Sequence, residues 1–303
     1  NIGLMTLSFR KFMMNFPLAV QGAFWMAVSA FCYVGSAVLI RFIGDAYSPF
    51  LLTFFRSVIA VIMLAPMIYR VRWSSLWPKR PIPVLMTGIF SYVGIFLWFY
   101  AAGRMPVAEF FALQFATPLF TIAFAIIFLR ERSDLASWVA TFIGFAGILI
   151  VLRPGFIEIT TASIAAVACA ASYASVNTLI KSLSKSVTTT VIVFYANVLL
   201  VPVSLPMAIK DWQLPYLSDW PTIVGAAVLS TIGYITVSKG IAMAAARVVH
   251  PVNFLRMPLG AVFGWIIFSE FPDIWTWVGA IIIFCATTYT VHRGTQRNRK
   301  KND

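Results

Sequence analysis

Two arginines, Arg56 and Arg256, lie well inside long apolar stretches of the sequence, where a charged side chain is hardest to accommodate. An ionised side chain near the centre of a bilayer costs roughly 2.5–3.5 kcal/mol even on the gentler insertion scales, so each requires an aqueous cavity or an acceptor. Arg256 shares a helix face with Asn253 and Gly260. Its guanidinium could receive a substrate carboxylate through two parallel hydrogen bonds, or it could pair with backbone carbonyls at a packed interface. We expect Arg56 to belong to the scaffold.

Polar and aromatic side chains recur every four residues in several apolar segments, which places each set on one helix face. Two of these stripes, containing Tyr33 and Tyr173, could face each other and line one cavity. Aromatic walls would suit a neutral or aromatic ligand, although helix packing and interfacial anchoring use the same residue types. The predicted substrate-binding residues are Trp25, Ser29, Tyr33, Tyr92, Phe96, Tyr173, Asn177, Tyr234, Asn253 and Arg256.

The sequence offers little for catalysis. It contains no G-x-x-x-x-G-K-[ST] phosphate loop and no H-E-x-x-H motif, and no cluster of intramembrane acids accompanies a histidine. Cys32, Cys169 and Cys285 fall inside apolar segments, where a thiol behaves as a small hydrophobic group. We therefore expect no enzyme activity, no cofactor, no metal site and no disulfide.

The elements that must position the candidate residues are membrane-spanning helices. Of the 303 residues, 60% are hydrophobic and only 11% are charged, which is far outside the range of soluble domains. A segment of about 20 apolar residues can cross a bilayer as a helix that satisfies every backbone group internally. The hydropathy pattern predicts ten spans, at residues 18–40, 48–69, 82–102, 106–129, 135–152, 159–180, 188–209, 220–243, 247–269 and 274–292.

The net charge of +13 is distributed over alternate short loops, which favours membrane orientation over nucleic-acid binding. With a cytoplasmic N-terminus, 16 of the 23 lysines and arginines face the cytoplasm. Only Arg41, Arg104, Arg153 and Lys210 then lie on the opposite side. The positive-inside rule predicts from this bias that both termini are cytoplasmic, which requires an even number of spans.

The two halves of the sequence resemble each other at shifts of 140 and 139 residues. The aligned positions include Tyr33 with Tyr173, Pro66-Met67 with Pro206-Met207, Ser91-x-x-Gly94 with Ser230-x-x-Gly233, Glu131 with Glu270, and Trp138 with Trp277. Because each copy holds five spans, the second copy must enter the membrane from the opposite side. Such inverted repeats are a transporter architecture, with the substrate site near the midplane between the halves.

These patterns together predict an all-α membrane protein with ten transmembrane helices arranged as two inverted five-helix repeats. The expected parts are a cytoplasmic N-terminal segment at 1–17, a first repeat at 18–152, a second repeat at 153–292 and a basic cytoplasmic tail at 293–303.

The first half contains the motifs Phe54-Phe55-Arg56, Ala116-Thr117-Pro118-Leu119-Phe120 and Phe128-Leu129-Arg130-Glu131-Arg132, and the second half contains Met257-Pro258-Leu259 and Phe268-Ser269-Glu270. With these motifs, nearly the whole chain resembles the EamA-type ten-helix branch of the drug/metabolite transporter superfamily. Within it, the sequence looks most like the bacterial exporters of aromatic and other neutral amino acids, the YddG-like group. The second copy departs from the first where Ala196 replaces Arg56, so we do not expect equivalent halves.

The resemblance implies a secondary transporter that exports neutral or aromatic amino acids, or related small metabolites, by alternating access through a central cavity. One alternative is a transporter of phosphorylated or nucleotide-linked metabolites, bound by Arg56, Lys239 and Arg256 together. A membrane receptor or membrane enzyme is a further alternative. The expected partners are a small-molecule substrate and the lipid bilayer of the bacterial inner membrane, without nucleic acid. No oligomeric state is predicted.

Overall fold

The computed structural model describes residues 16–68, 81–129, 135–153, 158–183, 197–243 and 252–302, and within these ranges every regular element is an α-helix. The predicted all-α class is therefore confirmed. The helices are α2 (Leu18–Ile43), α3 (Pro49–Ile68), α4 (Pro81–Ala102), α5 (Val107–Gln114), α6 (Thr117–Leu129), α7 (Leu135–Leu152), α8 (Thr161–Leu183), α10 (Leu200–Lys210), α11 (Trp220–Met243), α13 (Arg256–Phe268) and α14 (Ile274–Asn302).

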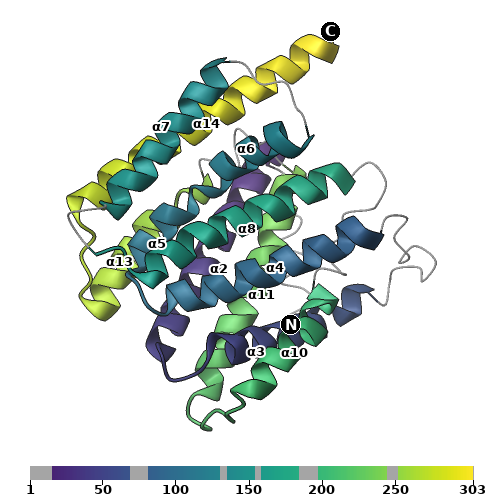
Figure 1. Cartoon of the computed structure of the whole chain (residues 1–303), viewed down its shortest axis with the longest axis vertical. Helices are drawn as coiled ribbons and strands as arrows, with labels where there is room; N and C mark the ends of the chain where they lie inside the picture. The colour runs from purple at the N-terminus through teal and green to yellow at the C-terminus, as the bar shows by residue number, and fades with distance from the viewer. Residues whose placement is uncertain are drawn as a thin grey trace.

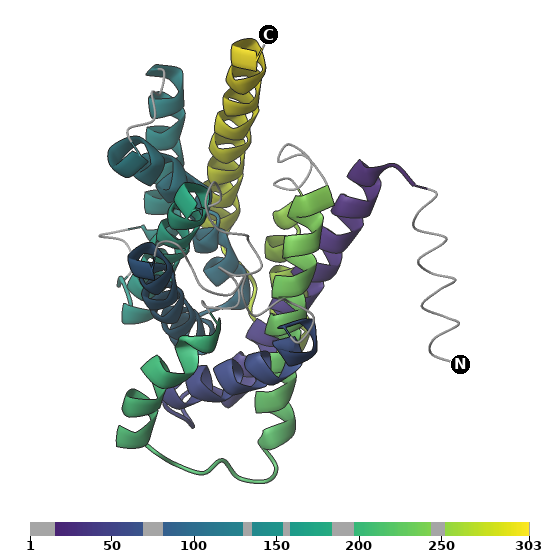
Figure 2. The same cartoon turned by 90° about the vertical axis from the view of Figure 1, so that its right-hand side faces the viewer.

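The helices pack mainly as pairs that are distant in sequence. α7 runs beside α14 at one edge of the molecule, and α3 packs against α10 at the opposite edge (Figure 1). Between these edges, α2 packs along α11, and α4 packs along α8. Figure 2 shows the α2 and α11 pair, in purple and light green, on one side and the blue and teal α4 and α8 on the other.

The described helices are apolar, and some of them are long enough to cross a membrane. Large apolar side chains such as Ile62, Phe142 and Ile266 are exposed on the outer surface, as expected for a chain surrounded by lipid. Among the described residues, five segments are long and apolar enough to cross a membrane, namely Val20–Ile43, Pro81–Ala102, Val107–Phe128, Thr161–Ile180 and Trp220–Gly240. Shorter apolar helices occupy Pro49–Ala65, Trp138–Leu152, Leu200–Lys210, Arg256–Phe268 and Ile274–Tyr289.

The predicted span at 106–129 is interrupted, since α5 ends before α6 begins. Pro118 has no N–H to donate to the Gln114 carbonyl, and the Thr117 hydroxyl donates to that oxygen instead, at 2.8 Å. A similar turn lies at the start of α13. There the Phe254 carbonyl accepts a hydrogen bond from the N–H of Met257, and Pro258 is the next residue. Hydropathy could not show either break, because the residues around both prolines are apolar.

Helix ends also differ from the hydropathy limits. α2 continues to Ile43, where Gly44 ends it with a φ of 55°, a left-handed conformation that glycine adopts readily. α14 continues to Asn302 rather than ending at residue 292, because its basic residues end the apolar pattern but still favour helix. The segments 188–196 and 247–251 of two predicted spans lie outside the described residues.

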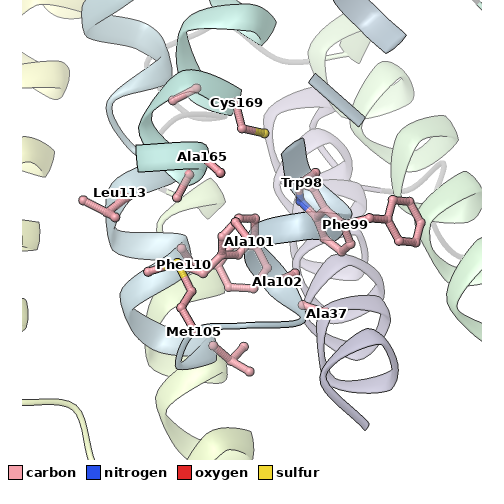
Figure 3. Packing of buried hydrophobic residues seen from close by; sticks show 14 of the residues in the cluster. Ala37, Trp98, Phe99, Ala101, Ala102, Met105, Phe110, Leu113, Ala165 and Cys169 are labelled. Carbon is pink, nitrogen blue, oxygen red and sulfur yellow. The ribbon is translucent and has the colours of Figure 1, made fainter. Parts of the chain in front are cut away.

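Small residues let α4, α5 and α8 approach each other closely at the centre of the apolar core. Ala101, Ala102 and Ala165 are buried at this point (Figure 3). The Trp98 ring of α4 packs edge-on against the Phe110 ring of α5, with centroids 5.5 Å apart. Close backbone approach over small residues is a usual way to hold helices together in lipid.

The contact between α7 and α14 leaves no room for a side chain at Gly279. A Cβ there would lie 2.5 Å from Cγ2 of Val151 and 2.7 Å from the carbonyl oxygen of Gly147. We expect Gly279→Ala to lower the free energy of unfolding by about 1–3 kcal/mol, because the two backbones must separate. Thermal unfolding of the purified protein in detergent measures the loss.

Gly264→Ala is the matched control, since a Cβ on Gly264 would meet no atom closer than 3.7 Å. Both substitutions gain about the same helix propensity, so the difference between the melting temperatures of the two variants reports the steric clash at Gly279. Equal melting temperatures for the two variants would show that α7 and α14 are not in this close contact.

Candidate substrate site

A cavity of about 130 Å³ lies between α2, α3, α4, α8, α11 and the beginning of α10. Its wall combines aromatic rings with hydroxyl and amide groups, and among the described residues it contains one arginine and no aspartate or glutamate. The polar lining residues are Tyr33, Arg56, Thr87, Ser91, Tyr173, Asn177, Asn197, Ser230 and Tyr234. Because an engineered apolar cavity of about 150 Å³ holds one benzene molecule, this cavity has room for a group of ring size.

Two tyrosine rings in the wall each lie against a glycine of the neighbouring helix. A Cβ on Gly233 of α11 would be 3.1 Å from the Tyr33 ring of α2. A Cβ on Gly94 of α4 would be 3.4 Å from the Tyr173 ring of α8. The missing Cβ of Gly233 therefore lets α11 close tightly over the Tyr33 ring, while at Gly94 the two helices are in ordinary contact.

Arg56 lies in the wall of the cavity and is only 7% exposed. Its Nη1 lies 3.4 Å from Oδ1 of Asn197, which is longer than the usual 2.9–3.0 Å of such a hydrogen bond. In the described part of the chain, the arginines that form ion pairs are Arg41, Arg104 and Arg153. The residue expected to be scaffold therefore presents its charge to the cavity.

Arg256 is not among the cavity-lining residues and lies against Tyr33. Its guanidinium carbon is 4.3 Å from the centroid of the Tyr33 ring, a cation–π geometry, and Nη2 donates to Oγ of Ser29 at 3.1 Å. Nε of Arg256 and Oδ1 of Asn253 are buried and have no hydrogen-bond partner within the described ranges. The structure thus joins three of the predicted site residues, Ser29, Tyr33 and Arg256, in one contact.

The cavity brings together some of the predicted residues and adds others. Tyr33, Tyr173, Asn177 and Tyr234 line it as the stripe pattern suggested. Thr87, Ser91, Trp98, Asn197 and Ser230 also line it and were not selected. In the sequence, the signal for these added residues was the alignment of Ser91 with Ser230 between the two halves. The others belong to residue types that are common in membrane helices and did not stand out.

The remaining predicted residues do not line this cavity. Trp25 lies beneath the Lys239 ammonium, which is 4.7 Å from the ring centroid. Phe96 stacks on Phe50 with centroids 4.4 Å apart. The Tyr92 hydroxyl is buried and lacks a hydrogen-bond partner among the residues that the structure describes.

The cysteines are free, and none is placed to bind a metal. Cys169 is buried and donates to the Gly94 carbonyl at 3.2 Å, while Cys32 is half-buried and Cys285 is exposed. Over the described ranges, no group of three or more histidine, cysteine, aspartate or glutamate side chains could hold a metal ion.

Three ion pairs gather at one end of the helix bundle. They join Arg41 to Glu270, Arg104 to Asp45, and Arg153 to Asp273. Nη2 of Arg41 lies 2.7 Å from Oε1 of Glu270, and Nη1 of Arg41 donates to the Gly103 carbonyl at 3.0 Å. At this end α2 is thus fastened both to the end of α13 and to the turn after α4.

A hydrogen bond joins two more loops at the same end. The Tyr47 hydroxyl donates to the Asp219 carboxylate at 2.5 Å, which connects the loop after α2 to the loop before α11. The hydrogen bond to the carboxylate raises the pKa of Tyr47, because the phenol can donate it only while protonated. From Trp98 near this end of α4, the cavity extends toward the other end, since its lining includes Thr87 near the start of α4 and the exposed Asn177 near the end of α8.

Comparison with known proteins gives the same picture of the whole chain. The model of the EamA-like transporter family matches twice, over residues 20–153 and 160–291. A riboflavin transporter of Vibrio cholerae is 29% identical over 289 residues, which are 94% of this chain and 97% of that protein. An S-adenosylmethionine uptake transporter of Rickettsia bellii is 26% identical over 280 residues, covering 92% and 96% of the two chains.

A more distant relative is a pseudopaline exporter of Pseudomonas aeruginosa, 25% identical over 238 residues that cover 78% of this chain and 83% of that one. None of these three proteins is named as an amino-acid exporter. One solved crystal structure, 21% identical, superposes with a TM-score of 0.60 over 88% of this chain and 96% of that chain, which shows a shared fold. Since the two family matches take in nearly every described helix and the entire cavity, the chain belongs to the EamA-like transporter family, within the drug/metabolite transporter superfamily.

Proposed function

We propose that the protein is a secondary transporter that carries a small metabolite with an aromatic or heteroaromatic ring across the bacterial inner membrane. The observation that carries this proposal is the ring-sized cavity bounded by Trp98 and three tyrosines, with hydroxyl and amide groups beside them. Aromatic walls hold a ring by stacking or edge contacts, and the polar groups orient it. Relatives named for riboflavin and S-adenosylmethionine support this substrate class, since both compounds contain a heteroaromatic ring.

Neutral and aromatic amino acids are the second candidate substrates. The volume of about 130 Å³ favours them, because pockets that enclose larger ligands usually measure roughly 300–1,000 Å³. A phosphorylated metabolite has less support. Of the three cations considered for it, only Arg56 lines the cavity, while Lys239 contacts Trp25 and Arg256 contacts Tyr33.

We further propose that the chain forms ten transmembrane helices in two inverted repeats, divided at residues 152 and 153. The helix pairs support this, because the repeat exchanges the α2 and α11 pair with the α8 and α4 pair. The repeat also maps α3 onto α10 and α7 onto α14, and the two helices of each of these pairs are in contact. Phe115 and Phe254 occupy equivalent positions, and their rings stack on each other with centroids 4.6 Å apart.

This arrangement allows alternating access if the ion-paired end opens when the opposite end closes. We propose that this end faces the periplasm, that both termini are cytoplasmic, and that the described state is closed at the periplasmic end. The loop charges support the orientation, because Arg41, Arg104 and Arg153 belong to the basic-poor side. The position of Asn177 supports a cavity that is reached from the cytoplasm.

The substrate class can be tested in proteoliposomes with radiolabelled riboflavin, S-adenosylmethionine, tryptophan and glucose 6-phosphate, with and without a pH gradient. We expect transport of at least one ring-bearing compound above empty liposomes, and none of glucose 6-phosphate. Tyr173→Ala should weaken the apparent affinity about tenfold, because it removes a wall of the cavity. The control Phe142→Ala, on the exposed surface, should not. Transport of glucose 6-phosphate alone would overturn the proposal.

The closed end can be tested by cysteine labelling in a variant without the three native cysteines. A cysteine introduced as Ser91→Cys lines the cavity and should react with a membrane-impermeant maleimide from the cytoplasmic side only. Adding Glu270→Gln should raise labelling from the periplasmic side about two- to fivefold, because it removes the ion pair with Arg41.

Glu158→Gln is the control for this experiment, since Glu158 is an exposed acid just before α8. It should leave periplasmic labelling unchanged. Labelling of the Ser91→Cys protein from the periplasm while Glu270 is unaltered would contradict either the orientation or the closed end.

Arg256 can be tested as a residue that positions Tyr33. Arg256→Gln should lower the free energy of unfolding without ligand by about 1–2 kcal/mol, because it removes the cation–π contact and weakens the hydrogen bond to Ser29. Apparent substrate affinity per folded molecule should change by less than about threefold. Arg256→Lys should restore part of the stability. A stable Arg256→Gln protein that no longer binds substrate would instead place Arg256 in the binding site.

A further inference from the structure

The cavity carries one positive charge that the described protein does not balance. Arg56 is nine-tenths buried and lines the cavity, where no aspartate or glutamate is found among the described residues. Its one hydrogen bond to a side chain in these ranges is the 3.4 Å contact with Asn197. A guanidinium has five N–H donors, so this contact uses one of the five that Arg56 has.

Four other arginines with described side chains, Arg41, Arg104, Arg153 and Arg256, each contact a carboxylate or an aromatic ring. Arg256 stacks on Tyr33 and donates to Ser29, and the arginines at the closed end each contact a carboxylate. A buried cation in a low-dielectric site is costly unless an anion or several acceptors surround it. Arg56 therefore has the properties of a group whose partner arrives from outside the chain.

The internal repeat also sets Arg56 apart from other residues that line the cavity. Other lining positions are matched between the two halves, Tyr33 with Tyr173 and Ser91 with Ser230. The position equivalent to Arg56 is Ala196, so the charge is present in the first copy alone. A cavity with equivalent tyrosines and serines but one cation would orient a ligand that has a negative end.

We propose that Arg56 binds a carboxylate of the transported molecule, so that the substrate is an aromatic or heteroaromatic carboxylate, including an amino acid. The inference rests on the proposed transport of ring-bearing metabolites and narrows its substrate class. The planar guanidinium matches a carboxylate with two parallel hydrogen bonds. A phosphate monoester is a poorer match, because it carries about −1.5 to −2 charges near neutral pH and meets one cation here.

Benzoate and benzamide provide the test, since they share a ring of the size that the cavity admits and differ in charge. Binding to purified protein in nanodiscs is measured at neutral pH by isothermal titration calorimetry, with phenyl phosphate as a third probe. We expect benzoate to bind about tenfold or more tightly than benzamide, and phenyl phosphate no more tightly than benzoate. Arg56→Gln should remove the preference for benzoate, while Arg56→Lys should keep a reduced preference.

Lys239→Gln is the matched control, because it removes an exposed positive charge from α11 outside the cavity and should keep the preference. Equal binding of benzoate and benzamide by the unmodified protein would overturn the inference and leave transport of ring-bearing compounds standing. Failure to bind either probe, together with no transport of any ring-bearing compound, would overturn both proposals. If Arg56→Gln does not fold, the unmodified protein and Arg56→Lys still decide the outcome.

Discussion

The cavity depends on two close approaches between helices, and in each a tyrosine ring lies against a glycine of the neighbouring helix. Gly233 lets α11 close over Tyr33, since a Cβ there would lie 3.1 Å from the ring, and Gly94 of α4 lies against Tyr173 of α8. A side chain at Gly233 would push the Tyr33 ring aside or force the helices apart, whereas a Cβ at Gly94 would just reach contact with Tyr173. The space that remains between the two pairs is the cavity, and its size follows from how closely those pairs can pack.

Composition and periodicity were sufficient to predict the helical class and the stripes that contain Tyr33 and Tyr173, because those signals are local. They could not rank Arg56 against Arg256, since both lie deep in apolar segments. The difference arises from neighbours far away in sequence. Ser29 and Tyr33 of α2 contact the Arg256 guanidinium, whereas among the described residues the hydrogen bond of Arg56 to a side chain is the 3.4 Å contact with Asn197. Faces of an apolar helix can be assigned from sequence only when polar residues mark them.

The same limit explains why the breaks before Pro118 and Pro258 were not predicted. Pro118 and Pro258 are visible in the sequence, but a proline can either begin a helix or kink it. In the structure both follow a short turn, and Phe115 and Phe254 from the two turns stack face to face. The contact that joins the two halves at this point is therefore made by residues whose pairing no hydropathy profile could reveal.

The three ion pairs at one end of the helix bundle could be broken at little cost. The side chains of Arg41 and Glu270 are 26% and 20% exposed, and pairs with such access to water contribute only about 0–1 kcal/mol each. A few such contacts can hold one end shut and still release it when a ligand favours the other arrangement. A deeply buried, fully dry network would instead cost several kcal/mol to break.

The single charge in the cavity has an electrical consequence. An empty cavity carries the positive charge of Arg56, and on the proposal above a bound carboxylate that has no ammonium group would neutralise it. Displacing one elementary charge across the whole membrane changes the free energy by about 2.3 kcal/mol per 100 mV. If the accessible side of the cavity alternates, an inside-negative voltage acts on the empty transporter and much less on the loaded one. The resting potential of the cell would then favour the arrangement in which the empty cavity is open to the cytoplasm.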